Sequence, residues 1–326
     1  MTSADVVAGV DWGGTWIRAA LAQAGDLVVQ IRQRRPDGVS EQIDLVCELI
    51  DGLVARLGRP ASRLGVGIAG ITRHGRVESA SNLGIRGPYD LERELRGRTG
   101  LPVILVNDAQ AAAVAESARL GPGTAVLLTI GTGIGGAIIA DGRLVLGEGA
   151  AGDFGHLVID ADGPECACGA RGCLEQMVSG RVLDQDARDL AKSGASPWLT
   201  ALASRRRGPK AADGSAGSEE YASLDATDLD AAAQAGDTAA ITTLERAAGT
   251  LVTALRSVTA AIDPAAIVLG GGVMTPGRLL PRLVRERWAE QRPRWSAAEL
   301  RPALLDPDAG LRGAALLAGG SADVWP

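Results

Sequence analysis

Three of the four cysteines in this 326-residue chain fall within eight residues, in the run Cys-Ala-Cys-Gly-Ala-Arg-Gly-Cys at 166–173. His156 lies ten residues before this run. Structural zinc sites take four tetrahedral nitrogen or sulfur ligands, and three thiolates with one imidazole complete that set. A disulfide within so short a segment would close a small loop and stabilise little. The spacing therefore predicts a structural zinc site made by His156, Cys166, Cys168 and Cys173.

Two parts of the chain repeat one pattern, in which a strand, a glycine turn and a returning strand follow one another. The turns are Gly13-Gly14 and Gly131-Thr-Gly-Ile-Gly-Gly136. A backbone that approaches a triphosphate closely needs residues without a Cβ, so the repeat predicts two phosphate-binding turns, with plain hairpin turns as the alternative. The expected strands are 6–10, 16–21 and 27–32 in the first copy and 125–130, 137–140 and 144–146 in the second.

Asn107 and Asp108 stand where an apolar run, 101–106, meets an alanine-rich segment, 109–120. The helix dipole and the unpaired N–H groups at such a junction favour an ionised carboxylate, which would keep Asp108 available as a general base at neutral pH. Asn and Asp are equally good helix caps. The local sequence leaves both interpretations open.

The remaining pattern alternates helices with strands and has one irregular segment. Residues 205–220 are rich in glycine and serine and predict a loop or disordered insertion, with Arg205–Arg207 as a solvated charge run. His74 lies in a polar turn and is expected to be exposed. Further helices are expected at 41–57, at 309–317 and around Leu244, Ala248, Leu251 and Leu255, and further strands at 64–68, 103–106 and 266–269.

Composition and charge describe a compact protein with no sign of nucleic-acid or membrane binding. Its length and its 46% hydrophobic residues suffice for two domains. A net charge of -6 and an isoelectric point near 5.2 offer no general attraction to phosphate backbones. We find no apolar run of the roughly 20 residues that span a bilayer and no leader pattern at the start. We therefore expect a cytoplasmic protein, in which thiolates stay reduced.

Several motifs together resemble the ROK family of sugar kinases and sugar-responsive repressors, and they follow the family's order along nearly the whole chain. They are Asp11-Trp-Gly-Gly-Thr15, Asn107-Asp108, Gly131–Gly136, Gly152-Asp-Phe-Gly-His156, Cys166-x-Cys-Gly-x-x-Gly-Cys-x-Glu175 and Gly270-Gly-Gly272. The resemblance implies an α/β fold with two actin-like, ribonuclease H-like lobes around a nucleotide and sugar cleft. The expected lobes are residues 1–118, joined by a C-terminal helix at 308–326, and residues 119–307 with the zinc loop.

The resemblance also implies the activity, an ATP-dependent kinase that phosphorylates the primary hydroxyl of a hexose or sugar-like molecule with Asp108 as general base. Asp11 would hold Mg²⁺ through water, and His156 would ligate zinc with one ring nitrogen and donate to a sugar oxygen with the other. We expect a homodimer or homotetramer that binds no nucleic acid. The implied sugar-binding residues are Gly70, Asn82, Asn107, Asp108, Asp153, His156 and Glu175, and the implied ATP-binding residues are Asp11, Gly13, Gly14, Thr15, Gly131, Thr132, Gly133, Gly271 and Gly272.

Two departures from the family pattern bear on the acceptor. Asp153 stands where the sugar kinases usually carry Glu, and Gly84-Ile85-Arg86 follows Asn82-Leu83 where glucose kinases usually show a tryptophan. These changes weaken the case for glucose and leave another hexose, an N-acetylated amino sugar or a cyclitol. Trp16 replaces a basic residue common after Gly-Gly-Thr, a change that the sequence does not explain.

Two other functional classes compete with the kinase. Asp153 also occurs in the repressor branch, but repressors carry a helix-turn-helix before the first phosphate turn, and Asp11 arrives here after only ten residues. A catalytically silent sugar sensor is disfavoured because Asp11, Asp108 and both glycine turns are intact. A kinase is therefore the expected function.

Overall fold

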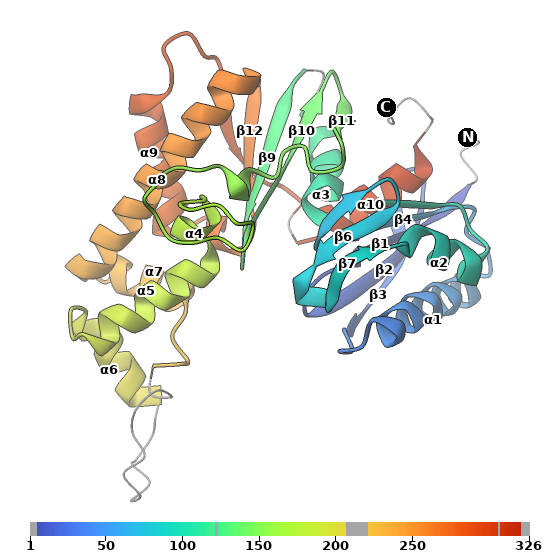
Figure 1. The fold of residues 1–326 in the computed structure, drawn as a ribbon, viewed down its shortest axis with the longest axis horizontal. Helices are drawn as coiled ribbons and strands as arrows, with labels where there is room; N and C mark the ends of the chain where they lie inside the picture. The colour runs from blue at the N-terminus through green and yellow to red at the C-terminus, as the bar shows by residue number, and fades with distance from the viewer. Residues whose placement is uncertain (1–4, 121–122, 207–220, 306, 321–326) are drawn as a thin grey trace, which may run out of the picture. The chain divides into compact units, whose positions relative to one another are not determined.

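The computed structural model describes residues 5–120, 123–206, 221–305 and 307–320, which contain both helices and strands (Figure 1). Two compact units emerge. Unit 1 comprises Met1–Leu127, Gly136–Gly152 and Ala303–Pro326, and unit 2 comprises Leu128–Gly135 and Asp153–Pro302. The lobe limits expected from the sequence, after residues 118 and 307, differ from these unit limits and stay a prediction.

Unit 1 contains a five-stranded sheet with the strand order β3-β2-β1-β4-β8. The first three strands form an antiparallel meander, and β1, β4 and β8 run parallel. The strands expected in this half of the chain are confirmed. They are β1 (Val6–Trp12), β2 (Trp16–Gln23), β3 (Asp26–Arg34), β4 (Leu64–Ile68) and β8 (Val103–Asn107).

Alternating side chains of β1 reach two different cores, as the period of a strand requires. Val6, Ala8, Val10 and Trp12 pack in the larger core with helix α1 (Val39–Leu57), whose apolar residues recur every three or four positions. Val7 packs with helix α10 (Ala309–Gly319). Figure 1 shows the two helices on opposite faces of the sheet. Both faces of β1 are therefore covered, and all seven of its residues are buried.

Unit 1 also holds a three-stranded sheet that the sequence did not predict, because its strands are short and contain many polar residues. Its order is β5-β6-β7. Its strands and the neighbouring helices are β5 (Ile71–Arg73), β6 (Arg76–Ala80), β7 (Ile85–Tyr89), the 3-10 turn Ser81–Leu83, α2 (Leu91–Thr99) and α3 (Asp108–Ser117). His74 lies in the turn between β5 and β6 with a side chain 75% exposed, as expected.

The second five-stranded sheet has the order β11-β10-β9-β12-β13, and the division between the units passes through β9 and β10. The two sheets share one strand order. If the strands of each sheet are numbered along the chain from one to five, their order across the sheet is 3-2-1-4-5 in both. The repeat inferred from the glycine turns is thus a repeat of topology. The strands are β9 (Ala125–Ile130), β10 (Ile134–Ala140), β11 (Arg143–Val145), β12 (Ala266–Gly270) and β13 (Glu299–Pro302).

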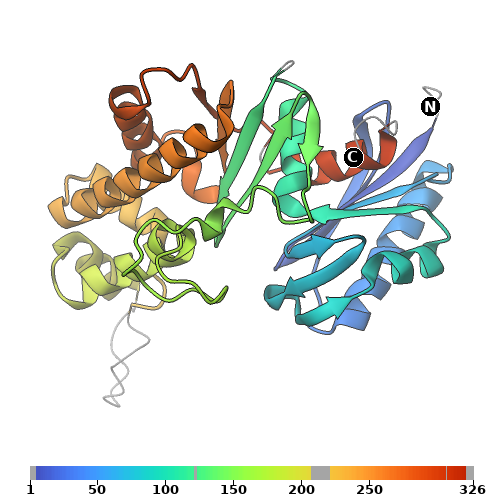
Figure 2. The same ribbon diagram turned by 45° about the horizontal axis from the view of Figure 1, so that its top comes forward.

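Helices make up much of the rest of unit 2. The long α8 buries Leu244, Ala248, Leu251 and Leu255, as their helical spacing predicts, and it packs against α9 (Figure 2). The helices are α4 (Glu175–Val178), α5 (Gly180–Lys192), α6 (Pro197–Arg206), α7 (Ala226–Gln234), α8 (Thr238–Ile262) and α9 (Leu279–Gln291). Among the residues that the structure describes, no helix has the length and apolar character needed to cross a membrane.

The expectation of a solvated loop from residue 205 onward is wrong for its first two residues. Arg205 and Arg206 end α6, which buries Leu199. The guanidinium of Arg206 donates to both carboxylate oxygens of the buried Asp228, at 2.6 and 2.7 Å. Such a bidentate pair with a buried carboxylate anchors the helix end, which charge composition alone did not reveal. Residues 207–220 of the expected insertion lie outside the described part of the chain.

Helix α10 approaches α3 so closely that a glycine is required between them. A Cβ added to Gly313 would overlap the backbone carbonyl of Ala111 on α3. Both atoms belong to helix backbones, so neither can rotate away as a flexible side chain could. The separation of α3, which begins with Asp108, from α10 therefore depends on the missing side chain at Gly313.

We predict that Gly313→Ala lowers the free energy of unfolding by about 2 kcal/mol or more, because overpacking forces the two helices apart. Gly52→Ala is the matched control, since Gly52 is an exposed residue of α1 and its added Cβ meets nothing within 4 Å. The control should gain roughly 0.5–1 kcal/mol from reduced freedom of the unfolded chain. Urea unfolding of both variants measures this, and equal stability of Gly313→Ala and wild type would contradict the close packing.

Candidate active site and metal centre

The end of β8 is held by a reciprocal cap around Asn107. The Asn107 side-chain oxygen accepts from the backbone N–H groups of Ala109 and Gln110, at 2.8 and 3.3 Å. In return, the backbone N–H of Asn107 donates to the side-chain oxygen of Gln110. The Asn107 amide nitrogen donates to the carbonyl of Gly70 at 3.0 Å. The capping interpretation is therefore confirmed for Asn107, and the same amide fixes Gly70 beside it. Whether either residue contacts a sugar stays a prediction.

Asp108 follows as the first residue of α3, with its Oδ1 accepting from the backbone N–H of Ala109 at 2.9 Å. Burial, and secondarily the charge of Asp11, raise the pKa of Asp108 to about 7, although hydrogen bonds from Ala109 and Asn107 oppose the rise. The helix terminus, which favours the ionised form, is opposed here by burial and by the like charge of Asp11, and the role of Asp108 as general base stays a prediction. A pKa near the working pH nevertheless suits a general base.

Asp11 is the penultimate residue of β1, and Arg18, which the sequence did not single out, holds its carboxylate. The β1–β2 register places Arg18 directly opposite Asp11, and its Nε donates to Asp11 Oδ2 at 2.8 Å. The guanidinium also contacts Asp308, at 3.4 Å. Burial raises the pKa of Asp11, while Arg18 lowers it. If the residues on either side of the Gly13-Gly14 turn are paired as an antiparallel hairpin, Asp11 comes opposite Arg18, so the sequence contained a signal for this pair. The role of Asp11 toward Mg²⁺ stays a prediction.

The first glycine turn connects β1 to β2. The Gly13 N–H donates to the carbonyl of Trp16 at 3.0 Å, and Arg35 Nε donates to the carbonyl of Gly14 at 2.7 Å. A Cβ built on Gly14 would lie 3.8 Å from the Cβ of Asn82, so Asn82 lies beside this turn. Unit 1 thus brings together Asn82, the first turn and the carboxylates of Asp11 and Asp108.

The second glycine turn connects β9 to β10, and two neighbouring segments hold it. Gly180 N–H donates to the carbonyl of Gly131 at 2.7 Å, and Arg181 N–H to that of Thr132 at 3.3 Å. Gly271 has a φ of 89° and lies against the backbone of Ile130 with no room for a Cβ. The residues predicted to bind the phosphates and the adenosine, Gly131, Thr132, Gly133, Gly271 and Gly272, therefore share one part of unit 2.

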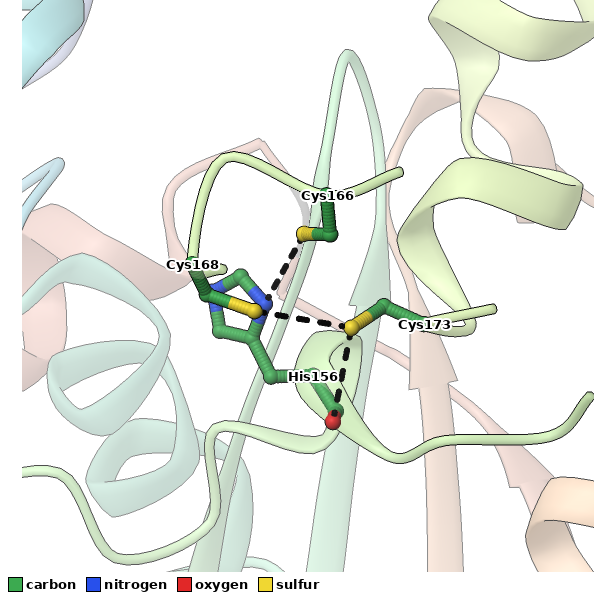
Figure 3. A group of neighbouring side chains, drawn as sticks. All are labelled: His156, Cys166, Cys168 and Cys173. Carbon is green, nitrogen blue, oxygen red and sulfur yellow. Dashed lines mark hydrogen bonds between the residues drawn. The ribbon is translucent and has the colours of Figure 1, made fainter. Parts of the chain in front are cut away.

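The four predicted metal ligands converge (Figure 3). Their ligand atoms all lie within 4.8 Å of one another. Cys166 Sγ lies 3.5 Å from His156 Nδ1, and Cys168 Sγ lies 3.6 Å from Cys173 Sγ. Two thiolates at 2.3 Å from one tetrahedral zinc ion stand about 3.8 Å apart, close to the observed spacing. All three cysteines are free thiols, so the disulfide alternative is not adopted, and the donor set fits zinc.

The imidazole of His156 joins the metal cluster to the predicted sugar pocket. Its Nδ1 faces the cysteines, whereas its Nε2 lies 3.8 Å from Asp153 Oδ2. Burial raises the pKa of Asp153, and the negative charge of Glu175 adds to the rise, while His156 lowers it. The grouping of Asp153, His156 and Glu175 in one place agrees with the sequence prediction, and their contact with a sugar stays a prediction.

Glu175 has a second neighbour that the sequence did not reveal. Its Oε2 accepts from the backbone N–H of Ile134 at 2.9 Å, and its Oε1 lies 3.7 Å from the guanidinium of Arg181. Ile134 begins β10, directly after the second glycine turn. Glu175 therefore contacts the phosphate turn as well as the group around His156, and no local sequence signal pointed to that contact.

We predict that Asp108→Asn stabilises the protein at pH 8 by roughly 2–4 kcal/mol and has little effect at pH 4. The folded-state pKa of Asp108 lies above that of the unfolded chain, so the ionised carboxylate costs stability once the pH passes the unfolded value of 3.8. The penalty becomes complete above pH 7. Asn keeps an oxygen that accepts from Ala109 and removes the charge. Urea unfolding at both pH values tests this, and an equal effect at pH 4 and pH 8 would contradict the raised pKa.

Comparison with known proteins identifies the family. The model of the ROK family matches residues 7–320. The N-acetylmannosamine kinase of Citrobacter koseri is 34% identical over 95% of this chain and 98% of its own length. A ROK family glucokinase from Streptomyces griseus, solved with glucose and AMPPNP, is 31% identical, with a TM-score of 0.78 over 96% of this chain and 99% of its own. The ROK hexokinase of Thermus thermophilus, also 31% identical, has a TM-score of 0.75 over 96% and 98% of the two chains. The chain belongs to the ROK family and is an ATP-dependent sugar kinase with the actin-like two-lobe fold.

Proposed function

We propose that this sugar kinase phosphorylates the primary hydroxyl of an N-acetylated amino sugar, with N-acetylmannosamine as the first acceptor to test. The observation that carries the catalytic part is Asp108, which begins α3 with a pKa of about 7 and lies near the carboxylate of Asp11. The relatives named N-acetylmannosamine kinase in Citrobacter koseri and Escherichia coli, each 34% identical, support the acceptor.

Asp108 would act as the general base. Its ionised form would accept the proton of the sugar hydroxyl as that oxygen bonds to the γ-phosphorus of ATP, the bond from that phosphorus to the bridging oxygen breaks, and ADP leaves. Backbone N–H groups of the glycine turns would bind phosphate oxygens. Phosphoryl transfer depends on positioning and on charge stabilisation. Asp11 would hold Mg²⁺ through water, and the bound ion would neutralise phosphate charge.

Two features of the chain support an acceptor larger than glucose. The segment Ser81–Pro88 has no aromatic residue, and after the buried Leu83 the chain turns at Gly84, with a φ of 81°, into the strand that begins at Ile85. Asp153 is one methylene shorter than the usual glutamate and lies beside His156. If these positions face the sugar as in the family, a missing aromatic ring and a shorter carboxylate would suit an N-acetyl substituent. Glucose is the second candidate, because the structural relative from Streptomyces griseus was solved with it.

A phosphorylation assay with ATP and a panel of acceptors tests the proposal. N-acetylmannosamine, N-acetylglucosamine, glucose, mannose and a cyclitol are compared by kcat/KM. Asp108→Asn should lower kcat by about 10²- to 10⁴-fold with its preferred acceptor, the usual contribution of a general base. For wild type, kcat/KM should rise with pH through about 7 as Asp108 ionises.

Asp90→Asn is the matched control for this assay. Asp90 caps α2 in the same unit, where its side chain accepts from the backbone N–H of Arg93, and it lies outside the proposed site. Near wild-type turnover in Asp108→Asn would rule out its role as base. A preference for glucose over every N-acetylated sugar would rule out the acceptor while leaving the kinase intact.

We propose that the metal centre holds one structural zinc ion, bound by His156 Nδ1 and the thiolates of Cys166, Cys168 and Cys173. Four donors from the protein fill a tetrahedral site and leave no position for a catalytic water. The zinc would fix the imidazole so that Nε2 carries the proton and donates toward the sugar. Reduced thiols also fit a cytosolic location, which we propose together with a homodimer or homotetramer as the assembly.

Elemental analysis of protein purified without added metal should find one zinc ion per chain. Replacing Cys166 and Cys168 together by Ser should abolish zinc binding and lower thermal stability, because the energy of metal binding contributes to folding. Cys47→Ser is the matched control, since Cys47 belongs to α1 in unit 1 and lies outside the cluster, and it should keep its zinc. Zinc retained by the double variant would rule out the assigned ligands.

A further inference from the structure

The second glycine turn is attached to the segment that follows the metal loop at three points. Two are the backbone bonds from Gly180 to Gly131 and from Arg181 to Thr132, at 2.7 and 3.3 Å. The third is made by a side chain, since Glu175 Oε2 accepts from the N–H of Ile134 at 2.9 Å. Glu175 lies two residues after the metal ligand Cys173. One short stretch of chain thus connects the metal loop to the phosphate turn.

The Glu175 carboxylate also occupies the space beside Gly133. A Cβ added to Gly133 would overlap Oε2 of Glu175, so the carboxylate packs directly on the turn. Arg181 lies 3.7 Å from the other oxygen, Oε1, and this orients the carboxylate. The side chain of Glu175 is 24% exposed. Its position is therefore determined by neighbours within unit 2.

The N–H of Ile134 depends on this contact. Ile134 is buried, and its N–H donates to the carboxylate of Glu175. Hydrogen bonds to an ionised acceptor are about twice as strong as neutral ones. A buried donor that loses its partner is costly, so the backbone at 131–134 would move to find another one.

We propose that Glu175 is a positioning residue for the nucleotide, which holds the turn Gly131–Gly135 in its phosphate-binding conformation through the N–H of Ile134. This inference rests on the proposed function, in that the turn must bind ATP. It assigns to Glu175 a role on the nucleotide side, in addition to the sugar contact expected from the family. The metal loop then supports both substrates, the sugar through His156 and the nucleotide through Glu175.

The test measures binding of AMPPNP with Mg²⁺ by calorimetry in the absence of sugar, on protein with its full metal content. Glu175→Ala should weaken binding about tenfold, the effect of losing roughly 1.4 kcal/mol. Glu175→Gln should stay within about threefold, because its amide oxygen can still accept from Ile134. Glu165→Ala is the matched control, since Glu165 lies in the same loop, is exposed and pairs with Arg171.

Hydrogen exchange of the backbone at 130–136 gives a readout independent of ligand affinity. Glu175→Ala should exchange faster there than wild type, and Glu175→Gln should not. Nucleotide binding and exchange that are unchanged in Glu175→Ala would overturn the proposal and leave Glu175 a sugar contact alone. If the wild-type protein binds sugar but no AMPPNP, the proposed function fails and this inference fails with it. If the wild type binds AMPPNP and Glu175→Ala is unchanged, only this inference fails.

Discussion

The burial of Asp108 is the constraint on which the character of the carboxylates in unit 1 depends. Burial disfavours an ionised carboxylate because little water can solvate its charge, and the like charge of Asp11 adds a smaller cost for Asp108. Arg18 neutralises Asp11 from the facing strand, whereas no cation is bonded to Asp108 among the described residues. Asp11 therefore has a cationic partner, whereas Asp108 has a raised pKa and no such partner among the described residues. This difference agrees with the proposed roles, in which Asp11 binds a cation and Asp108 accepts a proton.

The position of Asp108 depends in turn on packing far from the carboxylate. Helix α3 starts where Asn107 caps it, and Gly313 lets α10 lie against it. At the other end of α3, the buried Glu116 accepts three hydrogen bonds from the backbone N–H groups of Leu304 and Leu305, just before α10. The Asn107 cap and the buried Glu116 therefore hold the two ends of the helix that begins with Asp108, and Gly313 allows α10 to pack against it.

Unit 2 contains two segments of irregular backbone, the metal loop and the second glycine turn, whose conformations depend on contacts with neighbouring groups. The metal loop and the glycine turn lie outside long helices and sheets, and short backbone hydrogen bonds, such as that from Cys166 to Ala170, hold them together with side-chain contacts. Three cysteines and His156 would close the loop around one ion, and Glu175 with Gly180 and Arg181 then fixes the turn beside it. His156 faces Cys166 with Nδ1 and Asp153 with Nε2, and Glu175 accepts from Ile134 and lies beside Arg181. These contacts place the candidate metal ligands close to the predicted substrate-binding groups of unit 2.

Much of the fold and the convergence of the four candidate metal ligands could be predicted from the sequence, because they belong to local patterns. Short apolar runs predict strands such as β4 and β9, helical spacing predicts α8, and the spacing of Cys166, Cys168 and Cys173 predicts a cluster of candidate metal ligands. The charge state of Asp108, the pairing of Arg206 with Asp228 and the contact of Glu175 with Ile134 could not be predicted in this way. A pKa depends on burial and on charges brought close by the fold, and long-range contacts join residues that no local period connects. Only the tertiary structure decides these, because the free energy of a charge or a hydrogen bond depends on what surrounds it.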